Sequence, residues 1–91
     1  MPPNVEHEPG RFVLRIEGRV AELVYERRGD VLDIQHTYTP PPLRGREIAA
    51  RLTEAAFAYA RDEGLRVVPT CSYTALYVER HPEVRALVQG G

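Results

Sequence analysis

The sequence changes its hydrophobic period at one stretch, Pro40-Pro41-Pro42-Leu43-Arg44-Gly45-Arg46-Glu47-Ile48-Ala49. Before this stretch, apolar and polar residues alternate, which is the pattern of half-buried strands. After it, apolar residues recur every three or four positions, which is the pattern of an amphipathic helix. Because proline cannot donate to a strand ladder, the three prolines end the sheet. The stretch therefore predicts a junction of strand, loop and long helix.

Three alternating runs precede this junction and predict three strands, over residues 11–16, from residue 19, and over residues 31–39. Short turns at Glu17-Gly18 and Arg28-Gly29-Asp30 join them, and such connections are typical of an antiparallel meander. The alternation in the third strand predicts one shared face for Leu32, Ile34, His36 and Tyr38. Residues 1–10 carry three prolines and no period, so we expect a flexible N-terminal arm there and a single domain over residues 11–91.

Two helices and one further strand are predicted after the junction. One apolar stripe of the first helix comprises Ile48, Leu52, Ala55, Ala56 and Tyr59. Gly64 ends this helix, a short buried strand covers residues 65–69, and a second helix runs from about residue 73 to 80. A strand–helix–strand crossover places the last strand parallel to the third. The predicted order is β-β-β-α-β-α, an α+β fold with both helices on a mixed sheet.

Composition excludes several classes of protein. The chain has 91 residues, 12 basic against 13 acidic side chains, and one cysteine. This length supports one domain, and the near-neutral charge lacks the excess of basic residues that is typical of nucleic-acid binding. One cysteine and three scattered histidines argue against an internal disulfide and a structural metal site. No segment predicts a membrane span or a signal peptide, so we expect a cytoplasmic protein.

All the basic side chains are arginines, which limits the chemistry that the chain can perform. The absence of lysine excludes a Schiff-base mechanism, a lysine general base and the phosphate-binding loop that ends in Gly-Lys-Ser/Thr. Any phosphate must instead be bound by arginine and by backbone N–H groups. The start of the long helix offers both: the N–H groups of residues 45–48 are expected to lack helical partners, beside Arg44 and Arg46. An anion site and a merely solvated turn are both consistent with this pattern.

Residues 44–49, Arg-Gly-Arg-Glu-Ile-Ala, resemble the pyrophosphate-binding signature of GNAT-type acyl-CoA N-acetyltransferases, Gln/Arg-x-x-Gly-x-Gly/Ala. A wider set of short motifs is similar to those of a small single-domain branch of that family and occurs in the same order. These motifs are His36-Thr37-Tyr38, Cys71-Ser72-Tyr73, Tyr77 and Arg80-His81-Pro82-Glu83. The likeness runs from about residue 12 to 88.

The resemblance implies a truncated GNAT-like fold that binds acetyl-CoA or CoA. It implies transfer of the acetyl group to an unidentified amine. We expect direct attack in a ternary complex, because an amine needs little nucleophilic help to attack a thioester once the two are positioned. The implied cofactor-binding residues are Thr37, Tyr38, Leu43, Arg44, Gly45, Arg46, Glu47, Ile48, Ala49, Ser72, Tyr73 and Arg80.

Three side chains are candidates for catalysis, and each has a structural alternative. His36 is a candidate base, since an ordinary histidine pKa of about 6.5 suits neutral pH, or a core histidine. Cys71 precedes the second helix, whose N-terminus favours a thiolate; it is an acetyl carrier, a wall of the thioester pocket or a small buried hydrophobe. Tyr77 falls where the family's second helix often carries a tyrosine near the CoA sulfur, or it is a core aromatic.

Two departures from the family pattern keep other functions open. Glu47 stands where the family has its central glycine, so its carboxylate either lowers CoA affinity or points away from the phosphates. The direct turn at Glu17-Gly18 replaces the two helices that cover the acceptor site in ordinary GNAT enzymes. A CoA-binding module with little catalysis is therefore the main alternative. A sulfur-carrier-like protein is a weaker alternative. The end of the chain, Gln89-Gly90-Gly91, suggests it, but the long helix comes after three strands, whereas in such proteins it normally follows the first hairpin.

Overall fold

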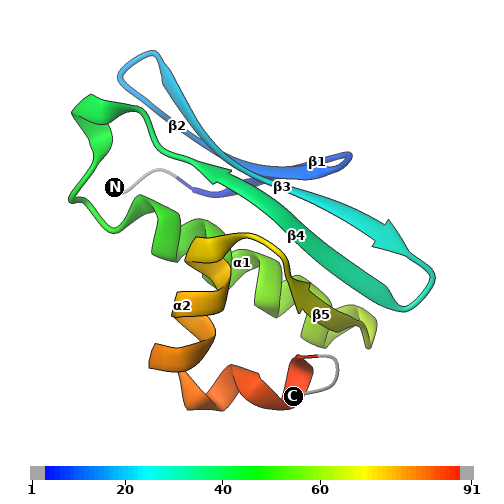
Figure 1. Ribbon diagram of the computed structural model, residues 1–91. Helices are drawn as coiled ribbons and strands as arrows, with labels where there is room; N and C mark the ends of the chain where they lie inside the picture. The colour runs from blue at the N-terminus through cyan, green and yellow to red at the C-terminus, as the bar shows by residue number, and fades with distance from the viewer. Residues whose placement is uncertain (1–3, 89–91) are drawn as a thin grey trace.

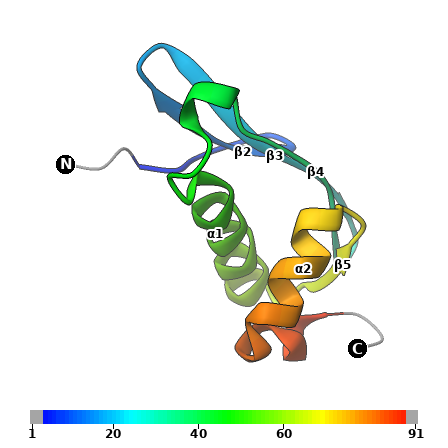
Figure 2. The same cartoon turned by 60° about the vertical axis from the view of Figure 1, so that its left-hand side comes forward.

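The computed structural model describes residues 4–88 (Figures 1 and 2). Its elements, in chain order, are β1 (Glu6–Glu8), β2 (Arg11–Ile16), β3 (Arg19–Arg28), β4 (Val31–Tyr38), the 3-10 segment η1 (Pro41–Leu43), α1 (Ile48–Glu63), β5 (Arg66–Pro69), α2 (Ser72–Arg80) and the 3-10 segment η2 (Pro82–Leu87). Among these residues, neither helix is both long and apolar enough to cross a membrane.

The five strands form one mixed sheet in the order β1-β2-β3-β4-β5. Neighbouring strands are antiparallel except β4 and β5, which pair in parallel, so the predicted meander and crossover are confirmed. Both helices lie on the same side of the sheet, with α1 along β2 and β3 and α2 near β5 (Figure 1). The core fills the space between α1 and the sheet and includes Leu14, Leu23, Leu52 and Phe57.

The prediction of a flexible arm is wrong for residues 6–8, which form β1 and pair with β2. Gly10 has a φ of +81° and makes the turn between the two strands. Arg11 binds the Glu8 carboxylate at 2.8 Å, and Arg15 binds it at 3.0 Å. Residues 6–8 are Glu-His-Glu and show no apolar alternation, so the hydrophobic pattern could not indicate this strand, which pairs with β2 and carries these ion pairs at the edge of the sheet. Residues 1–3 lie outside the described residues.

A bulge in β4 overturns the prediction that His36 and Tyr38 share a face with Leu32 and Ile34. Tyr25 of β3 pairs with Ile34, but the preceding residue, Val24, pairs with His36, so Gln35 is an extra residue. An extra residue reverses the alternation that follows it. Ile34 therefore faces the core, whereas His36 and Tyr38 are exposed on the outer face of the sheet.

Candidate active site

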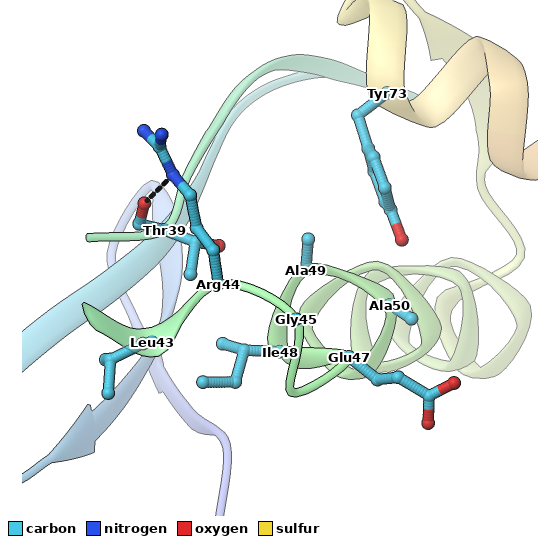
Figure 3. Close-up of a pocket in the computed structure, with 9 residues that line it drawn as sticks. All are labelled: Thr39, Leu43, Arg44, Gly45, Glu47, Ile48, Ala49, Ala50 and Tyr73. Carbon is cyan, nitrogen blue, oxygen red and sulfur yellow. Dashed lines mark hydrogen bonds between the residues drawn. The ribbon is translucent and has the colours of Figure 1, made fainter. Parts of the chain in front are cut away.

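A cavity of about 320 Å³ lies where the end of β4 approaches the start of α1 (Figure 3). The loop between them forms its floor, and Tyr73 of α2 hangs over the first turn of α1. The lining residues are Thr39, Leu43, Arg44, Gly45, Glu47, Ile48, Ala49, Ala50 and Tyr73. The cavity thus lies at the predicted anion-binding junction.

The first turn of α1 contributes the N–H groups of residues 48–50 to this junction, so the helix starts at the last residue of the predicted range, residues 45–48. Gly45 and Glu47 have φ angles of +84° and +58°, in the left-handed region, so the right-handed helix begins only at Ile48. The first hydrogen bond of α1 runs from the Arg51 N–H to the Glu47 carbonyl at 3.1 Å. The N–H groups of the first turn have no helical acceptor, and they carry the positive end of the helix dipole. An anion in the cavity would face them.

Glu47 adopts the backbone conformation that glycine adopts most easily. It is the N-cap residue of α1, and its side chain makes no capping hydrogen bond. Its carboxylate points away from Arg44 and Gly45, along the outside of the helix (Figure 3). Of the two predicted orientations, the structure shows the one that leaves the loop side of the cavity free of negative charge.

Only one of the two predicted arginines lines the cavity. Arg44 donates from Nε to the Thr39 carbonyl at 3.1 Å, which fixes the guanidinium group beside the end of β4. Arg46 is exposed and lies 3.8 Å from a carboxylate oxygen of Glu17, in the turn between β2 and β3. Positive charge at the cavity therefore comes from Arg44 and from the helix terminus.

A second cavity, of about 300 Å³, continues the first one between α1 and α2. The two share Glu47, Ala50 and Tyr73, and the second also reaches Arg80. Burial raises the pKa of the Tyr73 phenol; Arg80 opposes this effect and Glu47 adds to it. Tyr73 therefore keeps its proton at neutral pH and can donate a hydrogen bond to a ligand in this groove.

Cys71 lies where β4 and β5 separate. β5 ends at Pro69, paired with Ile34, while β4 continues for four residues. The Cys71 N–H donates to the Ile34 carbonyl at 2.9 Å, and its sulfur is 3.4 Å from the Thr37 hydroxyl. The structure thus joins Cys71 and Thr37 across the opening in the sheet.

The pKa of the Cys71 thiol is lower than its ordinary value. Burial alone would raise this pKa, but hydrogen-bond donors outweigh burial. The largest of these effects comes from the Thr37 hydroxyl, which lies within hydrogen-bond distance of the sulfur. The N–H groups of Thr74 and Tyr73 and the Thr74 hydroxyl lower the pKa further, although none of them makes a hydrogen bond of normal geometry to Cys71. The first turn of α2 therefore favours the thiolate, as the sequence predicted from its position.

The other predicted residues lie apart from this cavity. His36 and Tyr38 are on the outer face of the sheet, and Ser72 is exposed on α2. Tyr77 is buried, with its ring stacked between Phe57 (5.8 Å) and His81 (3.9 Å), and it lines the far part of the groove. Its ring thus packs in the core, which was the structural alternative for this residue.

Thr39 and Ala50, which line the cavity, and Thr74 were not predicted from the sequence. Thr74 is fully buried in α2, three residues after Cys71. The side chain of an N-cap residue can reach the N–H of the residue three positions later, so this spacing could have indicated that Thr74 lies next to Cys71. Within residues 4–88, no three histidine, cysteine or acidic side chains are grouped as metal ligands.

Comparison with known proteins places the chain in one family. A model of the GCN5-related N-acetyl-transferase family matches residues 11–87. Protein NATD1 of Danio rerio is 39% identical over 89 residues, covering 92% of this chain and 81% of its own length. Protein NATD1 of Homo sapiens is 40% identical over 86 residues, covering 89% and 76%.

A solution structure shows the same fold at lower identity. It is that of a GCN5-like protein of Staphylococcus aureus, which is 19% identical, has a TM-score of 0.74, and matches over 97% of this chain and 89% of its own. This agreement confirms the predicted GNAT-like α+β fold. The chain therefore belongs to the GCN5-related N-acetyltransferase family.

Proposed function

We propose that the protein is an acetyl-CoA-dependent N-acetyltransferase that modifies an amine. The observation that carries the proposal is the position of the sheet opening, with its thiol, close to the N-terminus of α1, whose N–H groups suit an anion. In the proposed complex, the N–H groups of residues 48–50 and Arg44 hold the pyrophosphate. Acetyl-CoA supplies the acetyl group as a thioester, and the chain orients it against the opening between β4 and β5.

The residues of the cavity suit such a ligand. Arg44 and the N-terminus of α1 provide positive charge, and Tyr73 provides a hydroxyl donor above them. Arg80 offers a second cation at the far end of the same groove. Glu47 is the one negative side chain that lines both cavities, and its carboxylate points away from Arg44 (Figure 3).

Two routes lead from the thioester to the amine. The sequence favours direct attack, with His36 as the base. His36 is on the outer face of the sheet, however, so it can serve only an amine that arrives there. The thiol of Cys71 lies in the opening itself and has a lowered pKa. This observation supports the route through sulfur: the Cys71 sulfur bonds the acetyl carbon, the CoA thiolate leaves, and the amine then displaces the Cys71 thiolate.

The experiment is incubation with acetyl-CoA, first alone and then with alkylamines, polyamines and lysine-containing peptides. Chromatography measures released CoA and acetylated amine. Intact mass measures acetyl groups on the protein. We expect one acetyl group on the protein, absent in Cys71→Ser and discharged by a competent amine. Turnover without this adduct, kept in Cys71→Ala, would establish direct attack instead.

A CoA-binding module with little catalysis is the second candidate function. The observation that favours it is the uncovered outer face: β2 runs into β3 through the turn at Glu17-Gly18, with no intervening helices to enclose an amine. CoA binding without an adduct and without turnover on any amine class would support this function.

A further inference from the structure

Two threonines from different elements flank Cys71, and the hydroxyl groups of both lower the pKa of its thiol. Thr37 approaches from β4, with its oxygen 3.4 Å from the sulfur. Thr74 approaches from the first turn of α2, and its Oγ1 is completely buried. Among the described residues, this Oγ1 has no hydrogen-bond partner of acceptable geometry. A buried hydroxyl without a partner costs stability unless a ligand or a charge uses it.

We propose that Thr37 and Thr74 are positioning residues that hold Cys71 as a reactive thiolate in the sheet opening. A neutral thiol is a weak partner for either hydroxyl, whereas a thiolate is a strong acceptor for both. The N–H groups of Tyr73 and Thr74 also lower the pKa of Cys71, although Cys71 makes no capping hydrogen bond with the first turn of α2. The unpaired Thr74 hydroxyl thus has its function in the ionised state of its neighbour.

No charged group on the surrounding elements explains the same preference. The groups that lower the pKa of Cys71 come from β4 and α2, and all of them are hydroxyls or N–H groups. Two titratable side chains are near in sequence. Tyr73, beside Cys71 on α2, keeps its proton, and His36, next to Thr37 on β4, faces the outer side of the sheet. The hydroxyls are therefore the side chains to test.

The test measures alkylation of Cys71 by iodoacetamide as a function of pH, in the full chain and without acetyl-CoA. In this reaction the sulfur displaces iodide and forms a C–S bond. Because Cys71 is the sole cysteine in the chain, intact mass reports this site alone. The midpoint of the pH profile is the pH at which the alkylation rate is half its maximum. We expect Thr37→Val and Thr74→Val each to raise this midpoint by about one pH unit. That change is about tenfold less thiolate at neutral pH, and the rates should converge in alkali.

Two kinds of variant separate this role from a loss of structure. Thr53→Val is the matched control, because Thr53 is equally buried but donates to the Ala49 carbonyl within α1. It should leave the midpoint unchanged. Thr37→Ser and Thr74→Ser keep the hydroxyl and should restore the wild-type midpoint.

The proposal is overturned if both valine variants keep the wild-type midpoint, if Thr53→Val shifts it equally, or if the rates differ by the same factor at every pH. Because acetyl-CoA is absent from the assay, failure of the proposed acetyl transfer would leave its result unchanged.

Discussion

Glu47 offers a test of the backbone that shapes the cavity. Its φ of +58° is unfavourable for any residue with a Cβ, by about 1–2 kcal/mol. Glycine avoids this cost but loses about 0.5–1 kcal/mol more conformational entropy on folding. Glu47→Gly also removes a charge from the helix N-terminus, so Glu47→Gln is the proper reference. We expect the glycine variant to be more stable than the glutamine variant by about 0.5–1 kcal/mol.

For a domain of this size, the difference corresponds to about 2–8 °C in Tm. Thermal unfolding followed by circular dichroism measures it, under identical buffer for both variants. Equal Tm values, or a less stable glycine variant, would contradict a left-handed conformation at residue 47.

The same pair of variants reports where the carboxylate points. A carboxylate facing the phosphates would weaken CoA binding by about 0.3–1 kcal/mol, or about two- to fivefold in Kd. Because the carboxylate points away from the loop (Figure 3), we expect Glu47→Gln to tighten CoA binding by less than about twofold. Calorimetric titration in low salt measures this effect. A fivefold gain that disappears in high salt would place the charge beside the phosphates.

Three further predictions follow from the geometry. Arg44→Ala should weaken CoA binding about fivefold by calorimetry, whereas Arg46→Ala, the matched control, should change it less than twofold; equal effects would refute the assignment of the cation. Gly45→Ala should lower the free energy of unfolding by about 1 kcal/mol in urea, since its φ is +84° and no atom lies within 4 Å of an added Cβ; an unchanged value would contradict this. The hydrogen bond from Thr70 holds the pKa of Asp33 below its ordinary value, against the effect of burial. The stabilisation by the ionised carboxylate is therefore complete above the unfolded pKa of about 3.9, and it is lost as the pH falls through the lower folded pKa. Asp33→Asn should thus be less stable than wild type at pH 7 and approach its stability in acid. A stability difference that stays constant with pH would argue against this linkage.

The order and direction of the main elements were predictable, because they depend on local period and on chain connectivity. Alternation predicted β2, β3 and β4, and the stripe over residues 48–59 predicted α1. Gly64 ends that helix with a φ of +69°, as its glycine indicated. The helix between β4 and β5 returns the chain to the same end of the sheet, so the strand–helix–strand order predicted that β5 is parallel to β4.

The features that were missed depend on partners distant in sequence. The bulge at Gln35 is a property of the pairing with β3, and the alternation of β4 alone cannot show it. That one residue moved His36 from the predicted site to the outer face. β1 is stabilised by arginines of β2, and Thr74 acquires its importance from Cys71. The positive φ at Glu47 was also hidden, since glutamate rarely adopts it, and it displaced the start of α1.

The most direct test of the central claim is a titration of ¹⁵N-labelled protein with CoA, followed by backbone amide chemical shifts. If the N-terminus of α1 and the sheet opening form the ligand site, the largest changes will be at Gly45, at residues 48–50, and at Thr37 and Cys71. The amides of Glu54 and Ala58, which line cavities on other faces of α1, should move little. Shifts concentrated at those residues, or no shifts at millimolar CoA, would contradict the account.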